Sequence, residues 1–304
     1  MITLLVHGGA GSAHLVRQDP QRRNEERRAL AQACAAGQAI LVAGGPAVDA
    51  VVAAVEVLED CPLFNAGRGA ALTRDGTAEL DAALMDGNSG RCGGVMGLTA
   101  VRHPIHAARL VMERSGHVLM HGVGAQHFAL ENGAESADPA WFITAQAQRN
   151  LADWRNDPQY AMRGTVGAVA LDASGHLAAA TSSGGLTGKR SGRVGDAPIP
   201  GAGTWADARV AVSATGDGEA FVRAHFAGRI AVQCEHGVNV NRAAEEALKR
   251  VAQQSGFGGG TGGCIVLCAD GTWSMPFTTA DMRRGCAIGH ATPRVAIFGD
   301  EDPT

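Results

Sequence analysis

The residue pair Gly164-Thr165 offers a nucleophile if the chain is cut between the two residues. A threonine hydroxyl is a weak nucleophile without a base beside it, and an N-terminal threonine has such a base in its own α-amine. That amine has a reference pKa of about 7.7 to 8.0, so a useful fraction is unprotonated near neutral pH. The pair therefore suggests self-cleavage followed by acyl transfer. Because β-branched residues favour strands anyway, a bare Gly-Thr is also compatible with an ordinary strand start.

A second group of hydroxyls follows in the motif Thr181-Ser182-Ser183-Gly184-Gly185. Apolar residues alternate over 165–171 and 177–181 around a turn at 172–175, which predicts a β-hairpin. The motif ends the second strand of this hairpin, so we expect its hydroxyls to return close to Thr165. Taken alone, the motif is an ordinary hydroxyl-rich turn.

Arg193 and Asp196 lie three residues apart in the glycine loop 192–198. Arginine binds a carboxylate through parallel hydrogen bonds, and a carboxylate binds an ammonium group, so the pair could clamp a free α-amino acid. A local salt bridge that holds the loop together explains the same spacing. The spacing alone favours the salt bridge.

The segment Thr215-Gly216-Asp217-Gly218-Glu219 lies between a predicted strand and a predicted helix. Backbone amides at a helix N-terminus receive anions, so the segment is a candidate anion site. The glycine run 258–263 adds a nucleotide site as an alternative. Neither loop has the lysine ending of a P-loop or the spaced glycines of a dinucleotide fingerprint, so nucleotide binding is the weaker interpretation.

Two further polar residues, His7 and Asn65, occur at glycine turns. Asn65 could donate its side-chain amide to an oxyanion, or it could simply cap a turn. His7 ends the first predicted strand, where most histidines are structural, so it has no part in the predicted mechanism. Cys264 and Cys268 form a close pair inside an alternating apolar run without nearby partner ligands, so we do not predict a metal site there.

The elements that must position these residues follow from apolar periodicity. In the first half, the pattern predicts strands at 2–6 and 93–101, a hairpin of 70–73 with 78–85, and helices at 24–42, 46–59, 106–113 and 123–132. In the second half, it predicts strands at 165–171, 177–181 and 210–214, paired strands at 262–268 and 272–276, and helices at 218–227 and 240–253. Both halves combine strands with helices, which suits a single α+β domain over 1–304.

The apolar pattern fails between about Glu135 and Arg163. This segment mixes polar residues with isolated aromatics and contains the breaker Asp157-Pro158. A structureless stretch of this length inside a compact domain usually has a functional or processing role. We therefore interpret about 135–164 as a mobile linker.

Charge and composition limit the expected partners. The 304 residues carry a formal net charge of -4, which gives no basic field for phosphates, so we predict no nucleic-acid partner. No apolar run approaches the roughly 20 residues of a membrane span, and the start of the sequence has no secretion signal. The seven scattered cysteines suit a reducing compartment, so we predict a cytoplasmic location.

Five sets of motifs occur in a fixed order along nearly the whole chain. They are His7-Gly8-Gly9-Ala10-Gly11, Asn65-Ala66-Gly67 with Glu79-Leu80-Asp81 and Met85-Asp86-Gly87, Gly164-Thr165-Val166-Gly167-Ala168-Val169, Gly192-Arg193-Val194-Gly195-Asp196, and Thr215-Gly216. Together they resemble the plant-type asparaginase and isoaspartyl peptidase family, which also contains the glycosylasparaginases. Each motif is modest alone, whereas the ordered set is specific.

The resemblance implies the four-layer αββα sandwich of the N-terminal nucleophile hydrolases. It also implies synthesis as an inactive precursor that cleaves itself between Gly164 and Thr165. The products would be an α subunit of residues 1–164 and a β subunit of residues 165–304. Two of each would form an (αβ)2 assembly.

The family's substrate-binding roles fall on the glycine loop and the anion segment. Thr165 would be the nucleophile, Arg193 would bind the substrate carboxylate, and Asp196 would bind the substrate ammonium. Gly218 would lie on the same substrate-binding side.

The remaining implied roles concern the oxyanion and the cleavage site. Thr215 and Gly216 would form the oxyanion hole, while Ser183 and Asn65 would support the nucleophile. The family usually has a second threonine where this chain has Ser183, so the hydroxyl is kept and the methyl that limits its rotamers is lost. This change could slow maturation. Asp217, at a position that varies in the family, would make the substrate side more acidic.

The family needs no cofactor for catalysis but commonly binds a structural sodium ion. The ligands are backbone carbonyls in the loop before the conserved asparagine. In this chain the corresponding residues are Leu58, Glu59, Cys61, Phe64, Ala66 and Arg68.

The implied reaction is acyl transfer in two halves, with β-aspartyl dipeptides and L-asparagine as substrates. The Thr165 hydroxyl attacks the side-chain amide of the aspartyl group, the amine departs, and water releases aspartate. Three alternatives stay open. They are a glycosylasparaginase-like amidase, which the missing secretion signal disfavours, a non-catalytic protein that binds small molecules or nucleotides, and a homologue that matures poorly because of Ser183.

Overall fold

The computed structural model describes residues 1–11, 19–158, 164–253, 260–301 and 303. Its strands are β1 Thr3–Ala10, β2 Leu80–Asp86, β3 Cys92–Leu98, β4 Leu119–His121, β5 Val166–Leu171, β6 Leu177–Ser183, β7 Thr204–Ala206, β8 Val210–Gly216, β9 Gly262–Cys268, β10 Trp273–Ser274, β11 Asp281–Ile288 and β12 Arg294–Phe298. Within the described residues they form two sheets. The larger runs β12-β11-β1-β5-β6-β2-β3-β4, and the smaller runs β10-β9-β8-β7.

The helices lie between the strands along the chain, and local residues start some of them. They are α2 Pro20–Val42, α3 Ala47–Asp60, α4 Pro104–Arg114, α5 Gly122–Glu131, α6 Ala145–Asn156, α7 Gly218–Ala224, α8 Phe226–Glu235 and α9 Val240–Gln253, with the 3-10 turns η1 Gly67–Gly69 and η2 Pro139–Phe142. Asp19 caps α2 by accepting from the Arg22 amide at 3.0 Å, and Pro20 opens the helix. Pro46 directly precedes α3, which has no side-chain cap at this end.

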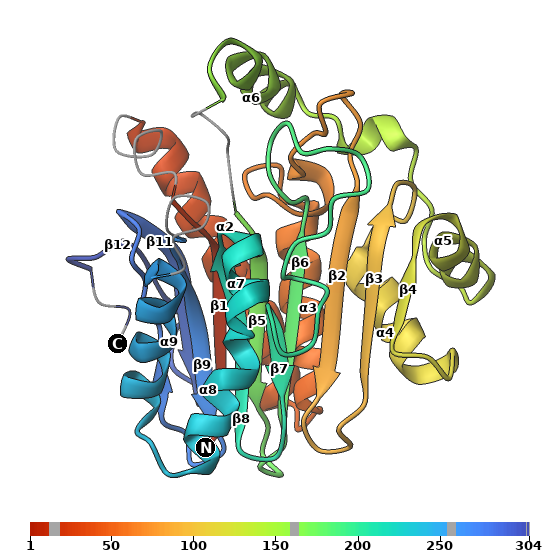
Figure 1. The fold of residues 1–304 in the computed structure, drawn as a ribbon. Helices are drawn as coiled ribbons and strands as arrows, with labels where there is room; N and C mark the ends of the chain where they lie inside the picture. The colour runs from red at the N-terminus through yellow and green to blue at the C-terminus, as the bar shows by residue number, and fades with distance from the viewer. Residues whose placement is uncertain (12–18, 159–163, 254–259, 302, 304) are drawn as a thin grey trace.

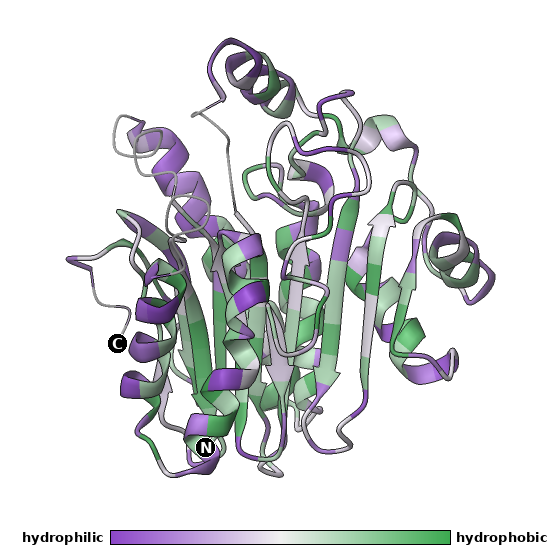
Figure 2. Ribbon diagram, in the orientation of Figure 1, coloured by the Kyte–Doolittle hydropathy of each residue, from purple (hydrophilic) through white to green (hydrophobic). Residues whose placement is uncertain are grey.

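Helices cover the outer face of each sheet, and the inner faces pack against each other. One buried cluster joins α2, α3, α4 and α5 to the larger sheet, and another joins α7, α8 and α9 to the smaller sheet. A third cluster fills the space between the sheets with residues such as Leu5, Val169 and Ile265. Figure 2 shows the hydrophobic residues concentrated along the strands. The chain is therefore a mixed α+β protein, as the sequence predicts.

Alternation along each strand decides which residues face the inter-sheet space. In β5, Val166, Ala168 and Ala170 contribute to the helix-side cluster, while Val169 and Leu171 contribute to the inter-sheet cluster. Successive side chains point to opposite faces of a strand, so Thr165 belongs to the inter-sheet side. The nucleophile candidate therefore lies at one end of the space between the two sheets.

Most predicted helices and strands are present in the structure, but the sequence analysis placed several of them incorrectly. The hairpin of 165–171 with 177–181 is confirmed as β5 and β6, and Asp172 fixes its turn by accepting from the amides of Ser174 and His176. The predicted hairpin of 70–73 with 78–85 is wrong, because β2 pairs with β3 and β6, and Leu72 forms only an isolated bridge to Ala78. The next strand β3 and the distant strand β6 flank this apolar strand, and local periodicity does not show which partners a strand takes.

The predicted helix at 218–227 is divided by His225, whose φ of 50° lies in the left-handed region. The chain turns there, so that α8 starts as a separate helix and continues to Glu235. A second difference from the sequence analysis lies near the C-terminus. The strands β11 and β12, which the sequence analysis did not predict, extend the larger sheet beside β1.

The prediction that about 135–164 is a linker without secondary structure is wrong. Residues 139–142 form η2 and residues 145–156 form α6, which Figure 1 shows beyond the ends of the strands. Thr144 caps α6 by accepting from the Ala147 amide at 3.1 Å, and Ala147 and Leu151 are buried. So few apolar residues give only a weak periodic signal. Residues 159–163 of this segment lie outside the described residues.

No described helix is both long enough and apolar enough to cross a membrane.

Candidate active site

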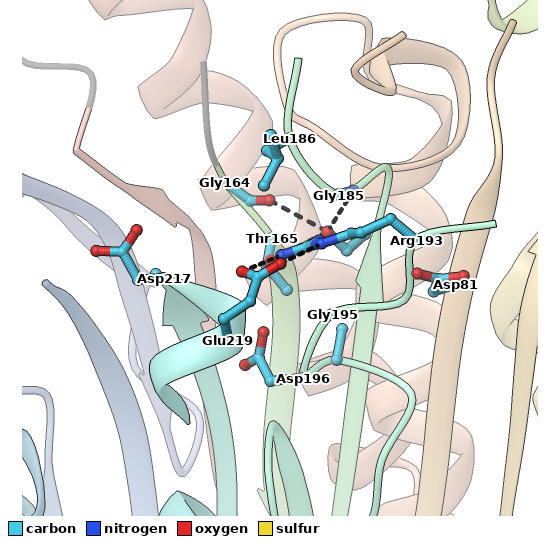
Figure 3. A pocket seen from close by; sticks show the side chains of 13 residues that line it. Asp81, Gly164, Thr165, Gly185, Leu186, Arg193, Gly195, Asp196, Asp217 and Glu219 are labelled. Carbon is cyan, nitrogen blue, oxygen red and sulfur yellow. Dashed lines mark hydrogen bonds and ion pairs between the residues drawn. The ribbon is translucent and has the colours of Figure 1, made fainter. Parts of the chain in front are cut away.

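The β5–β6 hairpin places the Thr165 hydroxyl beside Ser183, as its spacing predicts. Val166 pairs with Ser182 in antiparallel register, so the residue before Val166 lies next to the residue after Ser182. Thr165 Oγ1 donates to Ser183 Oγ at 3.1 Å. Both residues line a pocket at this end of the inter-sheet space (Figure 3).

Two side chains donate to the carbonyl oxygen of Gly164. Ser183 Oγ donates at 3.2 Å and Asn65 Nδ2 donates at 2.9 Å. Asn65 also donates to the Gly185 carbonyl at 2.6 Å and accepts from the Ala71 amide at 2.7 Å, which fixes its orientation. Asn65 therefore braces a turn, as one alternative predicts, and also directs a donor at the Gly164 carbonyl, while donation to an oxyanion stays a prediction.

The end of β1 packs directly against the Gly164-Thr165 peptide. A Cβ on Gly9 would lie 3.1 Å from Gly164 Cα and 3.3 Å from the Thr165 nitrogen, and the φ of Gly9 is 100°. Only glycine meets both conditions without strain. The His7-to-Gly11 motif therefore forms one wall of the predicted cleavage site.

Arg193 forms a two-pronged ion pair with Glu219, not with Asp196. Nε donates to Oε1 at 2.8 Å and Nη2 donates to Oε2 at 2.7 Å, as Figure 3 shows. The local Arg193–Asp196 salt bridge that the spacing favours is therefore wrong among the described ion pairs. Glu219 comes from the first turn of α7, and its distance in sequence from Arg193 explains why the pair was not predicted.

Asp196 is a buried carboxylate with one unused oxygen. Burial raises the pKa of Asp196 to about 6, and the positive charge of Arg193 acts in the opposite direction. Among the described residues its Oδ2 has no hydrogen-bond partner. Gly218 lies against the pair, since a Cβ there would be 2.9 Å from both Asp196 Oδ1 and Arg193 Nη2. The arrangement leaves a position for a cation beside Asp196.

Gly216 lines the pocket from the smaller sheet, and Thr215 precedes it on β8. Thr215 is fully buried, and its Oγ1 has no hydrogen-bond partner in the described part of the chain. Asp217 lines the pocket, and its Oδ2 accepts from the Thr261 amide at 2.7 Å. Asp217 thus ties the turn between β8 and α7 to the start of β9. The described part of the glycine run 258–263 belongs to this brace, and Gly258 and Gly259 lie outside the described residues.

The pocket gathers most of the predicted residues and adds several. The predicted residues that line it are Gly164, Thr165, Ser183, Arg193, Asp196 and Gly216. Asn65, Thr215 and Gly218 are not among the lining residues and lie behind them. Other lining residues were assigned no role in the sequence analysis, and they include Asp81, Gly185, Leu186, Gly195 and Glu219.

Asp81 pairs with Ser183 in the register of β2 and β6. Burial raises the pKa of the Asp81 carboxyl, which accepts from the Gly97 amide at 2.9 Å. Lys189, also buried, donates to the Glu79 carbonyl at 2.8 Å, and burial lowers its pKa. A carboxylate within an apolar strand was the sequence signal that could have identified Asp81.

The loop expected to hold sodium packs closely against main-chain carbonyl oxygens of the same segment. A Cβ on Gly67, whose φ is 50°, would lie 2.4 Å from the Glu59 carbonyl oxygen. Backbone carbonyls are hard oxygen donors of the kind that an alkali cation takes. Four of the carbonyls expected to hold sodium, those of Leu58, Cys61, Phe64 and Ala66, accept backbone hydrogen bonds in this loop, and sodium binding stays a prediction. Among the described residues no group of three or more His, Cys, Asp or Glu side chains could hold a metal ion.

The chain belongs to the asparaginase family, which matches residues 1–297 and is a family of N-terminal nucleophile hydrolases. It is therefore a hydrolase. An isoaspartyl peptidase of Escherichia coli is 42% identical, with 99% of this chain and 97% of the relative covered. A plant-type L-asparaginase of Pyrobaculum calidifontis is 40% identical over 94% of this chain and 96% of the relative. An isoaspartyl peptidase/L-asparaginase of Rattus norvegicus is 39% identical over 92% and 84%.

Proposed function

We propose that this chain is a precursor that cleaves itself between Gly164 and Thr165. The observation that carries the proposal is the position of Ser183, which accepts from Thr165 Oγ1 and donates to the Gly164 carbonyl. Thr165 Oγ attacks the Gly164 carbonyl carbon, and the Thr165 nitrogen leaves with a proton as an amine. Water then hydrolyses the resulting ester and leaves a carboxylate on Gly164. Ser183 and Asn65 stabilise the charge that develops on the carbonyl oxygen.

The mature enzyme, we infer, hydrolyses β-aspartyl dipeptides and L-asparagine. The released α-amine of Thr165 takes the proton of its own hydroxyl, which attacks the side-chain amide carbonyl of the aspartyl group. Thr215 and Gly216 bind the oxyanion, and the unpartnered Thr215 hydroxyl supports that role. The amine product departs with a proton, and water then releases aspartate from the acyl-threonine.

The clamp selects a free α-amino acid end. Glu219 occupies the Nε and Nη2 donors of Arg193, so the Nη1 donors remain for the substrate carboxylate. The substrate ammonium binds the unused oxygen of Asp196. Free glycosylated asparagine carries the same two groups, so the clamp does not distinguish it from the dipeptide and L-asparagine, and the comparison of turnover decides between them.

The remaining features of the proposal follow the family. The two sheets with outer helices correspond to an αββα sandwich, and cleavage gives subunits 1–164 and 165–304 in an (αβ)2 assembly. A structural sodium ion binds the carbonyls of the 58–68 loop, catalysis needs no cofactor, and the protein acts in the cytoplasm.

Intact mass spectrometry of the purified chain tests the cleavage. We expect two fragments with a new N-terminus at Thr165, and a single intact chain of 31.1 kDa for Thr165→Ala. Fragments in the Thr165→Ala variant would assign the cut to another agent. An uncut wild-type chain after prolonged incubation would support the poorly maturing or non-catalytic alternatives instead.

Product analysis tests the substrate. We expect the cleaved enzyme to release aspartate from a β-aspartyl dipeptide and from L-asparagine, with lower turnover of glycosylated asparagine. The opposite order would favour the glycosylasparaginase alternative. No release of aspartate from any of the three would contradict the proposed activity even if cleavage occurs.

A further inference from the structure

Helix α6 lies against the loop of residues 185–193, which we call the substrate loop because it contains Arg193. The ring of Trp154, in the last turn of α6, packs on the main chain of Gly188, since a Cβ on Gly188 would come within 2.2 Å of the ring. Nearer the start of the helix, Ala147 lines the same small pocket as Thr187. Helix α6 is therefore close to the substrate loop near both of its ends.

A second contact of α6 holds the segment with which the substrate loop pairs. Arg155 Nη2 donates to the Arg74 carbonyl at 2.9 Å. The Arg74 amide in turn donates to the Lys189 carbonyl at 3.0 Å, and Thr73 forms a bridge with Lys189. Two neighbouring residues of α6 thus contact the substrate loop and its partner segment.

Helix α6 depends on these contacts for its own stability. It has 12 residues, of which only Ala147 and Leu151 are buried. An isolated helix of this length is marginal in water even when its residues favour helix. Trp154 is half-buried and packs against the hydrophobic cluster of the larger sheet. Docking through Trp154 therefore keeps α6 helical.

The contact at Gly188 extends to the guanidinium group of Arg193. A Cβ on Gly185 would lie 2.9 Å from Lys189 Cδ and 3.3 Å from Arg193 Nη1, so these side chains pack against the Gly185 main chain. Gly185 and Arg193 both line the pocket (Figure 3). The Nη1 donors are the ones that the proposed function assigns to the substrate carboxylate. A displacement of the main chain at residues 188–189 would therefore displace these donors.

The contact joins residues that the proposed cleavage assigns to different subunits. Helix α6 would belong to the α subunit of residues 1–164, and the substrate loop would belong to the β subunit of residues 165–304. None of the contacts described above involves Gly164 or Thr165. Breaking the peptide bond between these two residues therefore removes no contact that holds α6 in place.

We propose that α6 stays docked on the substrate loop after cleavage and that Trp154 is a positioning residue for Arg193. The inference rests on the proposed cleavage and substrate. Trp154 is not among the residues that line the pocket, so it acts by holding Gly188. The contact of Arg193 with the carboxylate exists in the bound substrate and in the transition state alike, so disturbing it raises KM and leaves kcat nearly unchanged.

Steady-state kinetics of the cleaved variants with L-asparagine test the positioning role. We expect Trp154→Ala to raise KM about tenfold, the effect of one hydrogen bond to a charged group, with kcat within about twofold. Trp154→Phe keeps an aromatic ring over Gly188 and should raise KM about threefold or less. Asp153→Ala is the matched control, because Asp153 is the neighbouring residue of α6 and is exposed.

The split between KM and kcat distinguishes positioning from general structural support. If Trp154→Ala keeps KM within about twofold of wild type, or lowers kcat at unchanged KM, Trp154 does not position Arg193. An equal rise of KM in Asp153→Ala would also contradict the role, since it would follow from any change in α6.

Hydrogen exchange measured by mass spectrometry tests the docking directly, in cleaved wild type and in uncut Thr165→Ala. We expect α6 and the substrate loop to exchange slowly in both proteins and faster in Trp154→Ala. Because undocked α6 would not stay helical, fast exchange of α6 in cleaved wild type would show that cleavage releases it. That result would overturn the proposal even if the Trp154 variants fail to fold.

The two measurements separate this inference from the proposed function. If cleaved wild type releases no aspartate, the proposed function has failed, and the exchange data then decide the docking alone, with slow exchange of α6 supporting it and fast exchange overturning it. If wild type releases aspartate, and Trp154→Ala matches it in both KM and exchange, the proposed function stands and the inference about α6 is wrong.

Discussion

The two ends of the inter-sheet space are made by the same strands and have opposite chemistry. At one end Leu5, Val169 and Ala179 pack against the smaller sheet in an apolar cluster. At the other end, beyond the pair Gly167 and Thr181, the last inward positions are Thr165 and Ser183, and both line the pocket. The difference shows that polar residues at the last paired positions of two strands can turn the end of an apolar core into a pocket. The backbone pairing of the strands stays the same.

The polar atoms near the pocket differ in how they are satisfied. His7 Nε2 lies within hydrogen-bond distance of Ser213 Oγ, and Thr204 donates to Thr181. Among the described residues, His7 Nδ1, Thr215 Oγ1 and Asp196 Oδ2 have no hydrogen-bond partner. A buried polar group without a partner costs roughly 1–3 kcal/mol, and in the proposed function the substrate would satisfy Thr215 and Asp196. The following predictions test whether function depends on the polar end alone.

The largest effect is expected from Asn65→Ala. It removes one of the two donors to the Gly164 carbonyl, and the loss of such a donor slows acyl transfer by about 10²- to 10³-fold. A time course of intact mass gives the cleavage rate. Val169→Ala, at the apolar end, should cleave at the wild-type rate and lower the free energy of unfolding by about 2 kcal/mol. Equal cleavage by Asn65→Ala and wild type would remove Asn65 from the mechanism.

A smaller effect is expected from pH, through Asp196. Burial raises its pKa from 3.8 to about 6, so the carboxylate is ionised above about pH 6 and protonated below it. Since only the carboxylate binds an ammonium group, the Kd of L-aspartate should rise about tenfold per pH unit below 6 and level off above it. Calorimetric titration measures this. Asp196→Asn should bind weakly without that transition, and an identical transition in this variant would assign the titration to another group.

Much of this site could be predicted from the sequence because its residues are brought together by elements that are close in the chain. The β5–β6 hairpin is set by alternation and a local turn, so the meeting of Thr165 and Ser183 follows from spacing. The relation of Arg193 to Glu219 does not, because it depends on how α7 packs against the glycine loop. The same holds for Asp81, whose place beside Ser183 requires the non-local pairing of β2 with β6.

The fold shows a similar division between local and long-range information. Helices α2 and α3 bury many apolar residues, and both were predicted. Helix α6 has a local cap at Thr144 but buries only Ala147 and Leu151, so few apolar residues indicate it in the sequence. Its Trp154 ring lies against Gly188, where a Cβ would come within 2.2 Å of the ring. Such packing depends on residues far away in the sequence, and a short sequence segment examined by itself does not contain them.

The smallest effect is expected from Ser183→Thr, which changes the polar end by one methyl group. The added methyl restricts χ1 of the hydroxyl that accepts from Thr165 and donates to Gly164, and a rotamer entropy of about 0.5 kcal/mol corresponds to about a twofold faster cleavage. The matched control is Ser182→Thr, because Ser182 points to the other face and donates to Glu59 at 2.6 Å. A time course of intact mass at one temperature compares the three chains. Slower cleavage by Ser183→Thr, or equal acceleration by Ser182→Thr, would show that the rotamer of residue 183 does not limit maturation.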